Sequence, residues 1–499
     1  MAIMADGECP NCERLKKEVE RLSRELERRN RDIANLIRRV EELERAGKRQ
    51  ASPFSKGEPK ERPKDSGQKE GHVGAFRPEP DPSQVNRRVN VPPPEGGRCP
   101  DCNAPLHKSR RRVVRQYMVD IPPPPPPDVT EFTHDARWCP QCRKWVAGRH
   151  PDQIADPLGP SRVVLGPRLI AYAAQLRFGQ GVPFRDVAAF LLAFYCLRVS
   201  HGALVRACHR LADRLDPTVG LIRVEIRTAL LKWIDETGWR MNGRNAWLWV
   251  FVTLRASLFL IRKRRGHEVP ADVIGLHFTG ILHCDGFLAY DSLIGDKQTC
   301  YFHILKAVRK ILETNKGLAA RFPRQVRRLL RDALRLRRRK DRMSMTDYAR
   351  RRDRLRDRLH RLVRLDREEG RAFYNEANDA LSGRLYRLQD QLFTFLDTPD
   401  AEATNSRAER EVRPGVIIRK ICGGCRTERG ARSFENITST LRTVERQAGL
   451  RFDNLVIAVL RNPDPEYAYP IFGRAPPPLP APHATYLSAC PVAVSAAGG

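Results

Sequence analysis

The sequence predicts a multidomain α+β protein, and three observations support this fold class. Apolar residues recur in heptads near the N-terminus, pairs of cysteines follow, and the second half alternates helical periodicity with runs of β-branched and aromatic residues. At 499 residues the chain can hold several domains and a sizeable core. Lys and Arg total 90 against 59 Asp and Glu, a formal charge of +31 that indicates a polyanionic partner, most simply nucleic acid.

A basic membrane-surface protein is the competing interpretation of this charge. The longest apolar run, residues 187–197, is much shorter than the roughly 20 residues that span a bilayer. The N-terminus also lacks the apolar region of a signal peptide. We therefore expect a cytoplasmic protein without a membrane partner.

Residues 13–46 are predicted to form a coiled coil. Apolar residues recur at alternating steps of four and three between charged flanks, which places them on one seam of a helix. The seam comprises Leu15, Val19, Leu22, Leu26, Ile33, Leu36, Val40 and Leu43, with Arg29 at its one polar position. We expect a second copy of the chain as the partner, giving a homodimer or a higher oligomer; a lone amphipathic helix packed on its own domain is the alternative.

Two segments have the composition of disordered chain. Residues 47–95 are rich in Pro, Gly, Ser, Lys and Glu and are predicted to be a solvated linker. Residues 470–499, which include "APPPLPAPHA", are predicted to be a Pro-rich disordered tail.

Two C-x-x-C pairs within residues 96–148 predict a zinc finger. Four thiolates can close a tetrahedral zinc site, and in a reducing compartment such pairs more often bind metal than form disulfides. The predicted ligands of one structural Zn²⁺ are Cys99, Cys102, Cys139 and Cys142. An unliganded pair is favoured for Cys9/Cys12, and a tight turn through two glycines is favoured for Cys422/Cys425.

Residues 154–218 are predicted to be helical and to bind DNA. "VPFRDVAAFLLAF" is followed by "LRVSHGALVRACHRLADRL", where Ser200 is placed to cap the second helix. Two helices joined by a tight turn resemble a helix-turn-helix, which would put the second helix in a major groove. Ordinary helical packing predicts the same apolar pattern.

Residues 225–460 are predicted to contain a sheet followed by helices. Three strands at 231–240, 246–255 and 257–265 form an antiparallel meander, and a short helix near 270–275 leads to a fourth strand at 280–286. A helical insertion is expected at about 313–390. Within it, residues 321–364 hold 19 Arg or Lys against 5 Asp or Glu, with apolar residues at helical spacing. This predicts a basic helical hairpin that contacts phosphates; a solvated charged face is the common alternative.

Three carboxylates stand out by their places in this pattern. Asp235 ends the first strand, Asp285 ends the fourth, and Glu409 lies on a helix after the insertion. Carboxylates that converge can hold two hard cations such as Mg²⁺, which clamp an in-line phosphoryl displacement. Taken singly, each aspartate could be a turn residue, and Glu409 could pair with Arg413 one helical turn away. Together their order is the layout of an RNase H-like α/β/α catalytic core interrupted by an insertion.

The chain resembles the DDE transposases of the insertion-sequence-66 family over most of its length. The coiled coil, the cysteine finger and three long blocks carry the resemblance: "DETGWRMNGRNAWLWVFVT", "CDGFLAYDSL" and "DTPDAEATNSRAEREVRPGVIIRKICGGCRTERGARSF". The sequence departs from the family pattern at Ser406, at Tyr301-Phe302 and at Cys422 and Cys425, whereas His303 is retained.

The resemblance implies roles for individual residues. The catalytic acids fall on Asp235, Asp285 and Glu409, which would hold two Mg²⁺ or Mn²⁺ ions. Glu236 is the alternative to Asp235, but neighbouring strand residues point to opposite faces, so only one of them can enter the site. The implied DNA-binding residues are Asn405, Arg410, Arg413, Arg419, Lys420 and His303.

The resemblance also implies the function. It predicts a nucleoid-associated enzyme of bacterial type that binds the terminal inverted repeats of a mobile element, cleaves them and joins the exposed 3′-hydroxyls to target DNA. Other proteins of the same element are candidate partners. The alternatives are an RNase H-like nuclease without strand transfer and a non-catalytic, zinc-dependent DNA-binding regulator.

Overall fold

The computed structural model describes residue 11 and residues 14–15, 17–29, 32–33, 77–107, 109, 112–160, 163–368 and 376–473. The chain divides into two compact units, residues 1–119 and 120–499. It is an α+β protein with a mixed sheet, which confirms the predicted class. Among the described residues, no helix is both long and apolar enough to cross a membrane.

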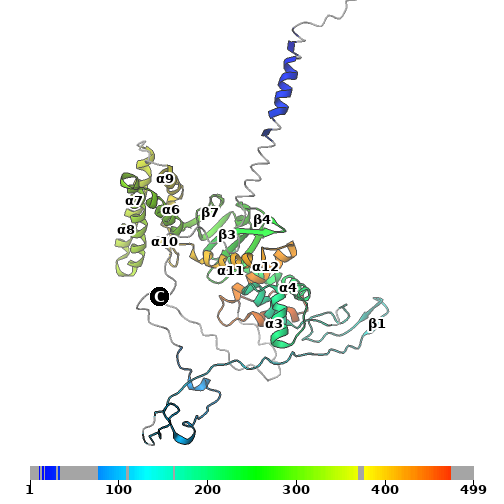
Figure 1. Ribbon diagram of the computed structural model, residues 1–499. Coiled ribbons are helices and arrows are strands. Elements are labelled where there is room, and N and C mark those ends of the chain that lie inside the picture. Colours follow the sequence, from blue (N-terminus) through cyan, green and yellow to red (C-terminus); the bar gives the residue numbers. More distant parts are fainter. Residues whose placement is uncertain are drawn as a thin grey trace, which may run out of the picture. The chain divides into compact units, whose positions relative to one another are not determined.

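The first unit contains the predicted N-terminal helix at residues 17–29 (Figure 1). Its seam faces solvent, since Leu15, Val19, Leu22 and Leu26 are each more than half exposed. Such a stripe leaves apolar surface for a partner helix, and the coiled coil stays a prediction. Residues 77–95 of the predicted linker contain no buried residue. Outside the described residues lie Leu36, Val40, Leu43, the pair Cys9/Cys12 and linker residues 47–76.

The second unit begins with a small hairpin and a group of helices. The hairpin pairs β1 (Arg137–Cys139) with β2 (Lys144–Val146). The helices are α2 (Pro167–Ala174), its π-helical continuation η3 (Gln175–Gly179), α3 (Phe184–Tyr195) and α4 (His201–Thr228). Ser200 caps α4 as predicted, because its hydroxyl accepts from the Ala203 N–H at 3.2 Å. The expected boundary at residue 218 lies inside α4, which runs 28 residues and packs on α12 and β5, so this segment shares the core of the sheet.

The sheet has five strands in the order β5-β4-β3-β6-β7. The predicted meander is β3 (Leu231–Met241), β4 (Arg244–Val252) and β5 (Ser257–Arg262), and α5 (Glu268–Ile274) leads to β6 (His277–Cys284). Asn242 and Gly243 both have positive φ, as a two-residue hairpin turn requires. The edge strand β7 (Ile294–Thr299), parallel to β6, was not predicted, because "IGDKQT" is polar and its first three residues are exposed.

Helices α11 (Ser406–Cys422), α12 (Glu428–Val444) and α13 (Phe452–Arg461) complete the core. α11 packs on β3 and β4, and α12 packs on β5 and α4 (Figure 1). On edge strand β5, alternate backbone N–H groups donate to side chains spaced four apart on α12. Two residues along a strand and four residues along a helix both span about 6–7 Å. The side chains of α12 therefore meet successive free N–H groups of β5, and α12 covers this edge of the sheet. These pairs are Ser257 with Thr443, Phe259 with Ser439, and Ile261 with Glu435.

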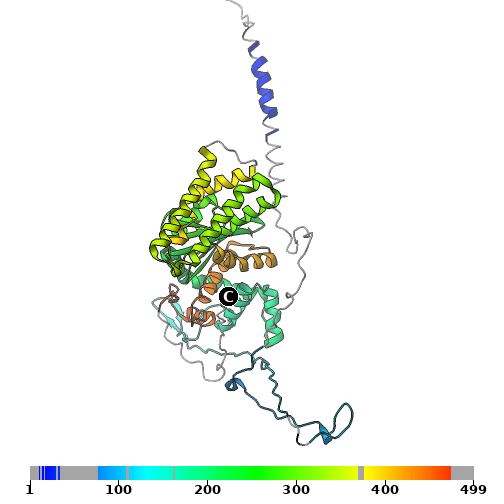
Figure 2. The ribbon, with the colours of Figure 1, turned by 90° about the vertical axis from the view of Figure 1, so that its left-hand side faces the viewer.

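The insertion is helical, as predicted. α6 (Tyr301–Thr314) leads into it, its helices are α7 (Arg321–Arg338), α8 (Met345–Glu368) and α9 (Glu376–Leu388), and α10 (Thr394–Asp397) follows it. Figures 1 and 2 show α7, α8 and α9 gathered beside the sheet, at the edge formed by β7. α7 buries its apolar face and leaves most of its arginines exposed. The 19 basic residues of 321–364 far exceed its 5 acids, so pairing within the segment cannot neutralise it.

Residues 470–473 of the predicted C-terminal tail are part of the folded unit. Ile471 is buried, and the Phe472 carbonyl accepts a hydrogen bond from Arg255 at 3.0 Å. Residues from 474 onward lie outside the described residues.

Candidate active site

Asp235 lies within β3, not at its end as predicted, and Asp285 directly follows the adjacent parallel strand β6 at the same level. The register pairs Leu231 with Ile281 and Trp233 with His283, an offset of 50 that also separates Asp235 from Asp285. Trp233 stacks on His283 with ring centroids 4.6 Å apart, which holds this register. Because neighbouring strands are about 4.8 Å apart and side chains alternate, the two aspartates reach the same face of the sheet.

The electrostatics of Asp235 show that acidic side chains gather around it. Burial raises the pKa of Asp235 to about 8, and the negative charges of Glu236, Asp285 and Glu409 add to the effect. Glu409 therefore lies close enough to interact with Asp235, although it is 174 positions later in the chain. A group of acids that repel one another in a half-closed site is suited to bind cations.

Glu236 is bound by other protein groups. Its side chain is 2 % exposed, Arg265 donates to Oε1 at 2.6 Å, and the Tyr290 hydroxyl donates to Oε2. Glu236 thus anchors the loop after β6 and the end of β5. This favours Asp235 as the acid available for a metal.

Two arginines of α9 hold the loop that carries Asp285. Arg384 donates to the Asp285 carbonyl at 2.7 Å, and Arg387 donates to the Gly286 carbonyl at 2.8 Å and to Asp291 at 2.5 Å. The sequence interpretation missed both arginines, because a helix within a basic insertion gave no sign of this contact. Asp291 follows the 3₁₀ turn Leu288–Tyr290 and pairs with Arg387.

Asn405 positions the helix that carries Glu409. It immediately precedes α11 and is fully buried, and its Nδ2 donates to the Ile234 carbonyl at 2.7 Å. This bond fixes the start of α11 beside the residue that precedes Asp235. Because no part of Asn405 is exposed, its place in the structure corresponds to a positioning role instead of the predicted DNA contact.

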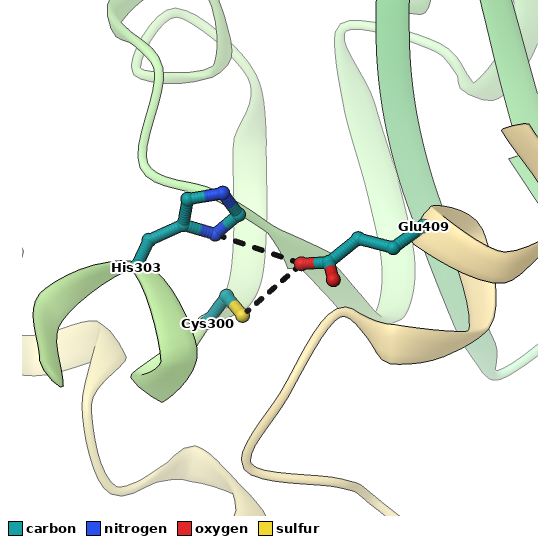
Figure 3. Close-up of side chains that lie close together, drawn as sticks. All are labelled: Cys300, His303 and Glu409. Carbon is teal, nitrogen blue, oxygen red and sulfur yellow. Dashed lines mark hydrogen bonds and ion pairs between the residues drawn. The ribbon is translucent and has the colours of Figure 1, made fainter. Parts of the chain in front are cut away.

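Glu409 contacts Cys300 and His303, both at the start of α6 (Figure 3). Its Oε1 lies 3.8 Å from the Cys300 Sγ and 3.7 Å from the His303 Nδ1. In the described part of the chain, these three side chains form the one group of possible metal ligands within 4.8 Å of one another, so the three predicted acids are more widely spaced. No ion pair between Glu409 and Arg413 is found among these residues.

The basic residues of α11 divide into two kinds. Arg410, Arg413 and Lys420 are exposed and available to a ligand. Arg419 is half-buried and donates to the Thr237 hydroxyl at 3.2 Å and to the Gly238 carbonyl, so it braces α11 against β3. Burial lowers the pKa of Arg419.

Glu411, the second glutamate of this segment, is a structural residue. It is buried and accepts from Arg442 Nε at 2.7 Å and from Arg446 Nη2 at 2.6 Å. Both arginines come from α12 and the turn that follows it. The contact joins α11 to α12, and it was missed because nothing local in the sequence pairs these residues.

The pairs Cys99/Cys102 and Cys139/Cys142 form two knuckles of similar design. The Cys99 carbonyl accepts from the Asn103 N–H at 2.9 Å, and the Cys142 N–H donates to Cys139 Sγ at 3.4 Å. Hydrogen bonds from the loop backbone lower the pKa of Cys99 and Cys139, which favours thiolates. The residue after each knuckle, Asn103 or Arg143, has positive φ. One shared Zn²⁺ stays a prediction.

The third pair, Cys422/Cys425, forms the predicted tight turn. Gly423 has positive φ where α11 ends, and Gly424 lies so close to the Arg240 carbonyl that a Cβ would be 2.2 Å from its oxygen. The Cys425 N–H donates to that carbonyl at 2.9 Å. Glycine is therefore required at 424 for α11 to end against β3.

Comparison with known proteins places the chain in a family. No curated protein matches it. A family model described as "Transposase IS66 family" matches residues 162–433, which include β3, β6, the whole insertion and α11. This range covers more than half of the chain and all three predicted acids. The chain belongs to the IS66 transposase family.

Proposed function

We propose that this transposase binds the terminal inverted repeats of its own mobile element and catalyses metal-dependent DNA strand cleavage and strand transfer. The observation that carries the proposal is the grouping of Asp235, Asp285 and Glu409. The negative charges of Asp285 and Glu409 both raise the pKa of Asp235, although the three residues lie far apart in the sequence. A meander, a parallel fourth strand, a helical insertion and a helix with Glu409 also support an RNase H-like core.

The three carboxylates fit two Mg²⁺ or Mn²⁺ ions by their chemistry. Hard cations take oxygen ligands, and two ions about 3.5–4 Å apart can be shared by acids that are too widely spaced to hold one. When bound, such ions activate the attacking oxygen and stabilise the leaving oxygen. The role of the protein is to gather the acids: β3 and β6 supply the aspartates, α9 holds the Asp285 loop, and Asn405 sets the start of α11.

The exposed cations of α11 and the insertion supply the DNA contacts in this proposal. Arg410, Arg413 and Lys420 lie on the helix that carries Glu409, so phosphates bound there are near the acids. The basic hairpin α7–α8 extends this surface. The zinc finger and the helical segment would recognise the element ends, and paired coiled coils would hold two ends together.

The test uses the full chain, a labelled repeat end, target DNA and Mg²⁺. Glu409→Gln should retain DNA binding and lower cleavage at least ~100-fold, which corresponds to about 3 kcal/mol of transition-state stabilisation. Glu428→Gln is the matched control, because Glu428 is exposed on α12 and pairs with Lys263, which is also exposed. Undiminished cleavage by Glu409→Gln would remove this glutamate from the site.

The same assay separates the alternatives. Cleavage followed by joining supports a transposase, and cleavage alone supports a nuclease. Binding without cleavage in wild type supports a non-catalytic regulator. Removal of zinc should weaken end binding; unchanged affinity would reject the recognition role of the finger.

A further inference from the structure

We propose that Cys300, His303 and Glu409 form a binding site for a transition-metal ion of the zinc class, which shares only Glu409 with the proposed magnesium site. The three side chains come from two segments that are brought together by the fold, the start of α6 and the first turn of α11. A thiolate, an imidazole and a carboxylate are ligands that suit Zn²⁺, whereas Mg²⁺ takes oxygens. The site itself does not depend on the proposed function.

The distances fit a tetrahedral ion. With metal–sulfur and metal–nitrogen or oxygen bonds of about 2.3 and 2.0 Å, tetrahedral ligand atoms lie roughly 3.3–3.5 Å apart. Glu409 Oε1 lies 3.8 Å from Cys300 Sγ and 3.7 Å from His303 Nδ1 (Figure 3). Both distances exceed the tetrahedral values by only a few tenths of an ångström, and the ligand atoms of Cys300 and His303 lie within 4.8 Å of each other.

An unsatisfied polar atom points to a missing ligand. The Nδ1 of His303 is shielded from solvent and has no hydrogen-bond partner, although it faces Glu409. A buried nitrogen without a partner costs free energy, and 3.7 Å is too long for a hydrogen bond to supply it. A metal ion between the two side chains would satisfy this nitrogen.

The surroundings also suit metal binding. The Asn405 N–H donates to Cys300 Sγ at 3.1 Å, which helps to hold a thiolate in place. His303 and Glu409 are each 32 % exposed, which leaves a route for the ion and room for a water as fourth ligand. On binding, the Cys300 thiol releases its proton to solvent.

This site has a consequence that rests on the proposed function. Both contacts involve Oε1 of Glu409, the carboxylate that the magnesium site needs. An ion held by Cys300 and His303 withdraws this oxygen from Asp235 and Asp285. Zn²⁺ should therefore inhibit cleavage that Mg²⁺ supports.

Binding is tested with Co²⁺ as a spectroscopic probe of tetrahedral thiolate sites in the full, metal-free chain. Wild type and Cys208→Ala, a control that removes another buried thiol, should bind one more Co²⁺ per chain than Cys300→Ala. The finger cysteines contribute equally to all three. His303→Gln, a change at a partly exposed residue, should weaken this one site at least ~10-fold while the chain stays folded. Equal stoichiometry and affinity in all variants would overturn the proposal.

Inhibition is tested separately. Micromolar Zn²⁺ added to a Mg²⁺ reaction should slow wild-type cleavage at least ~10-fold and slow His303→Gln much less, each relative to its own zinc-free rate. Equal inhibition of both would reject the shared-ligand consequence. Absence of any wild-type cleavage would count against the proposed function, and the cobalt measurement would still decide the metal site.

Discussion

Two glutamates on helix α11 occupy opposite surroundings. Glu411 faces α12, where two arginines neutralise it at 2.7 and 2.6 Å. Glu409, two residues earlier, faces the acids of β3 and β6, where its charge adds to the cost of ionising Asp235. Glu411 therefore joins α11 to α12, whereas Glu409 adds negative charge to a group of acids. Removing a buried, compensated acid destabilises the fold because its partners lose their counter-charge, whereas uncompensated acids are available to cations.

The largest predicted effect is a fall in the free energy of unfolding with rising pH, caused by Asp235 and the acids around it. Burial and neighbouring acids raise the pKa of Asp235 to about 8, from about 4 in an unfolded chain. Between these values the folded chain holds a proton that the unfolded chain has lost, so its free energy of unfolding falls as pH rises. The slope from Asp235 is at most about 1.4 kcal/mol per pH unit, and it vanishes above the folded pKa.

Denaturant unfolding in EDTA between pH 4 and 8 measures this slope. Asp235→Asn should flatten the curve and be more stable than wild type at pH 8, and Mg²⁺ should stabilise wild type more than the variant. Asp272→Asn, at an exposed position on α5, is the control and should follow wild type. If the free energy of unfolding depends on pH in the same way for Asp235→Asn and for wild type, the acids are not grouped around Asp235.

The compensated side gives the next largest effect. Glu411→Ala leaves Arg442 and Arg446 without their buried partner and should lower the free energy of unfolding by about 3 kcal/mol. Glu445→Gln removes a more exposed partner of Arg442 and should cost less than about 1 kcal/mol. Equal losses in urea unfolding would show that Glu411 is not the anchor of α11.

These contrasts show what the sequence could and could not predict. Local patterns predicted the meander, the Ser200 cap and the basic helices, because each depends on neighbours in the chain. The strand β7 was missed, since its exposed edge is polar. The bonds of Arg384 and Asn405 join residues that are 99 and 171 positions apart. Contacts between residues so far apart leave no pattern in the local sequence. The family resemblance therefore indicated the three acids, but nothing in the sequence indicated that Arg384 and Asn405 hold them in place.

A third variant tests the link between the two sides. Asn405→Ala removes the bond to the Ile234 carbonyl and should cost about 1–2 kcal/mol. It should also slow cleavage by more than the fraction unfolded explains, because Glu409 loses its position. Asn436→Ala is the matched control, a buried asparagine on α12 that bonds the Ala212 carbonyl at 2.9 Å. If both variants lower the cleavage rate per folded molecule equally, Asn405 contributes to stability and does not position Glu409.

The smallest effect is expected at the exposed cations of α11. Lys420 is exposed and pairs with no acid in the described part of the chain, so Lys420→Ala should change the free energy of unfolding by less than about 0.5 kcal/mol. DNA binding should weaken a few-fold for all sequences, and the slope of log affinity against log salt should fall by about one. Lys263→Ala, which removes an exposed lysine paired with Glu428, is the control and should leave that slope unchanged. If both lysines behave alike, the surface beside Glu409 is not a phosphate-binding surface, because a phosphate contact would distinguish them at low salt.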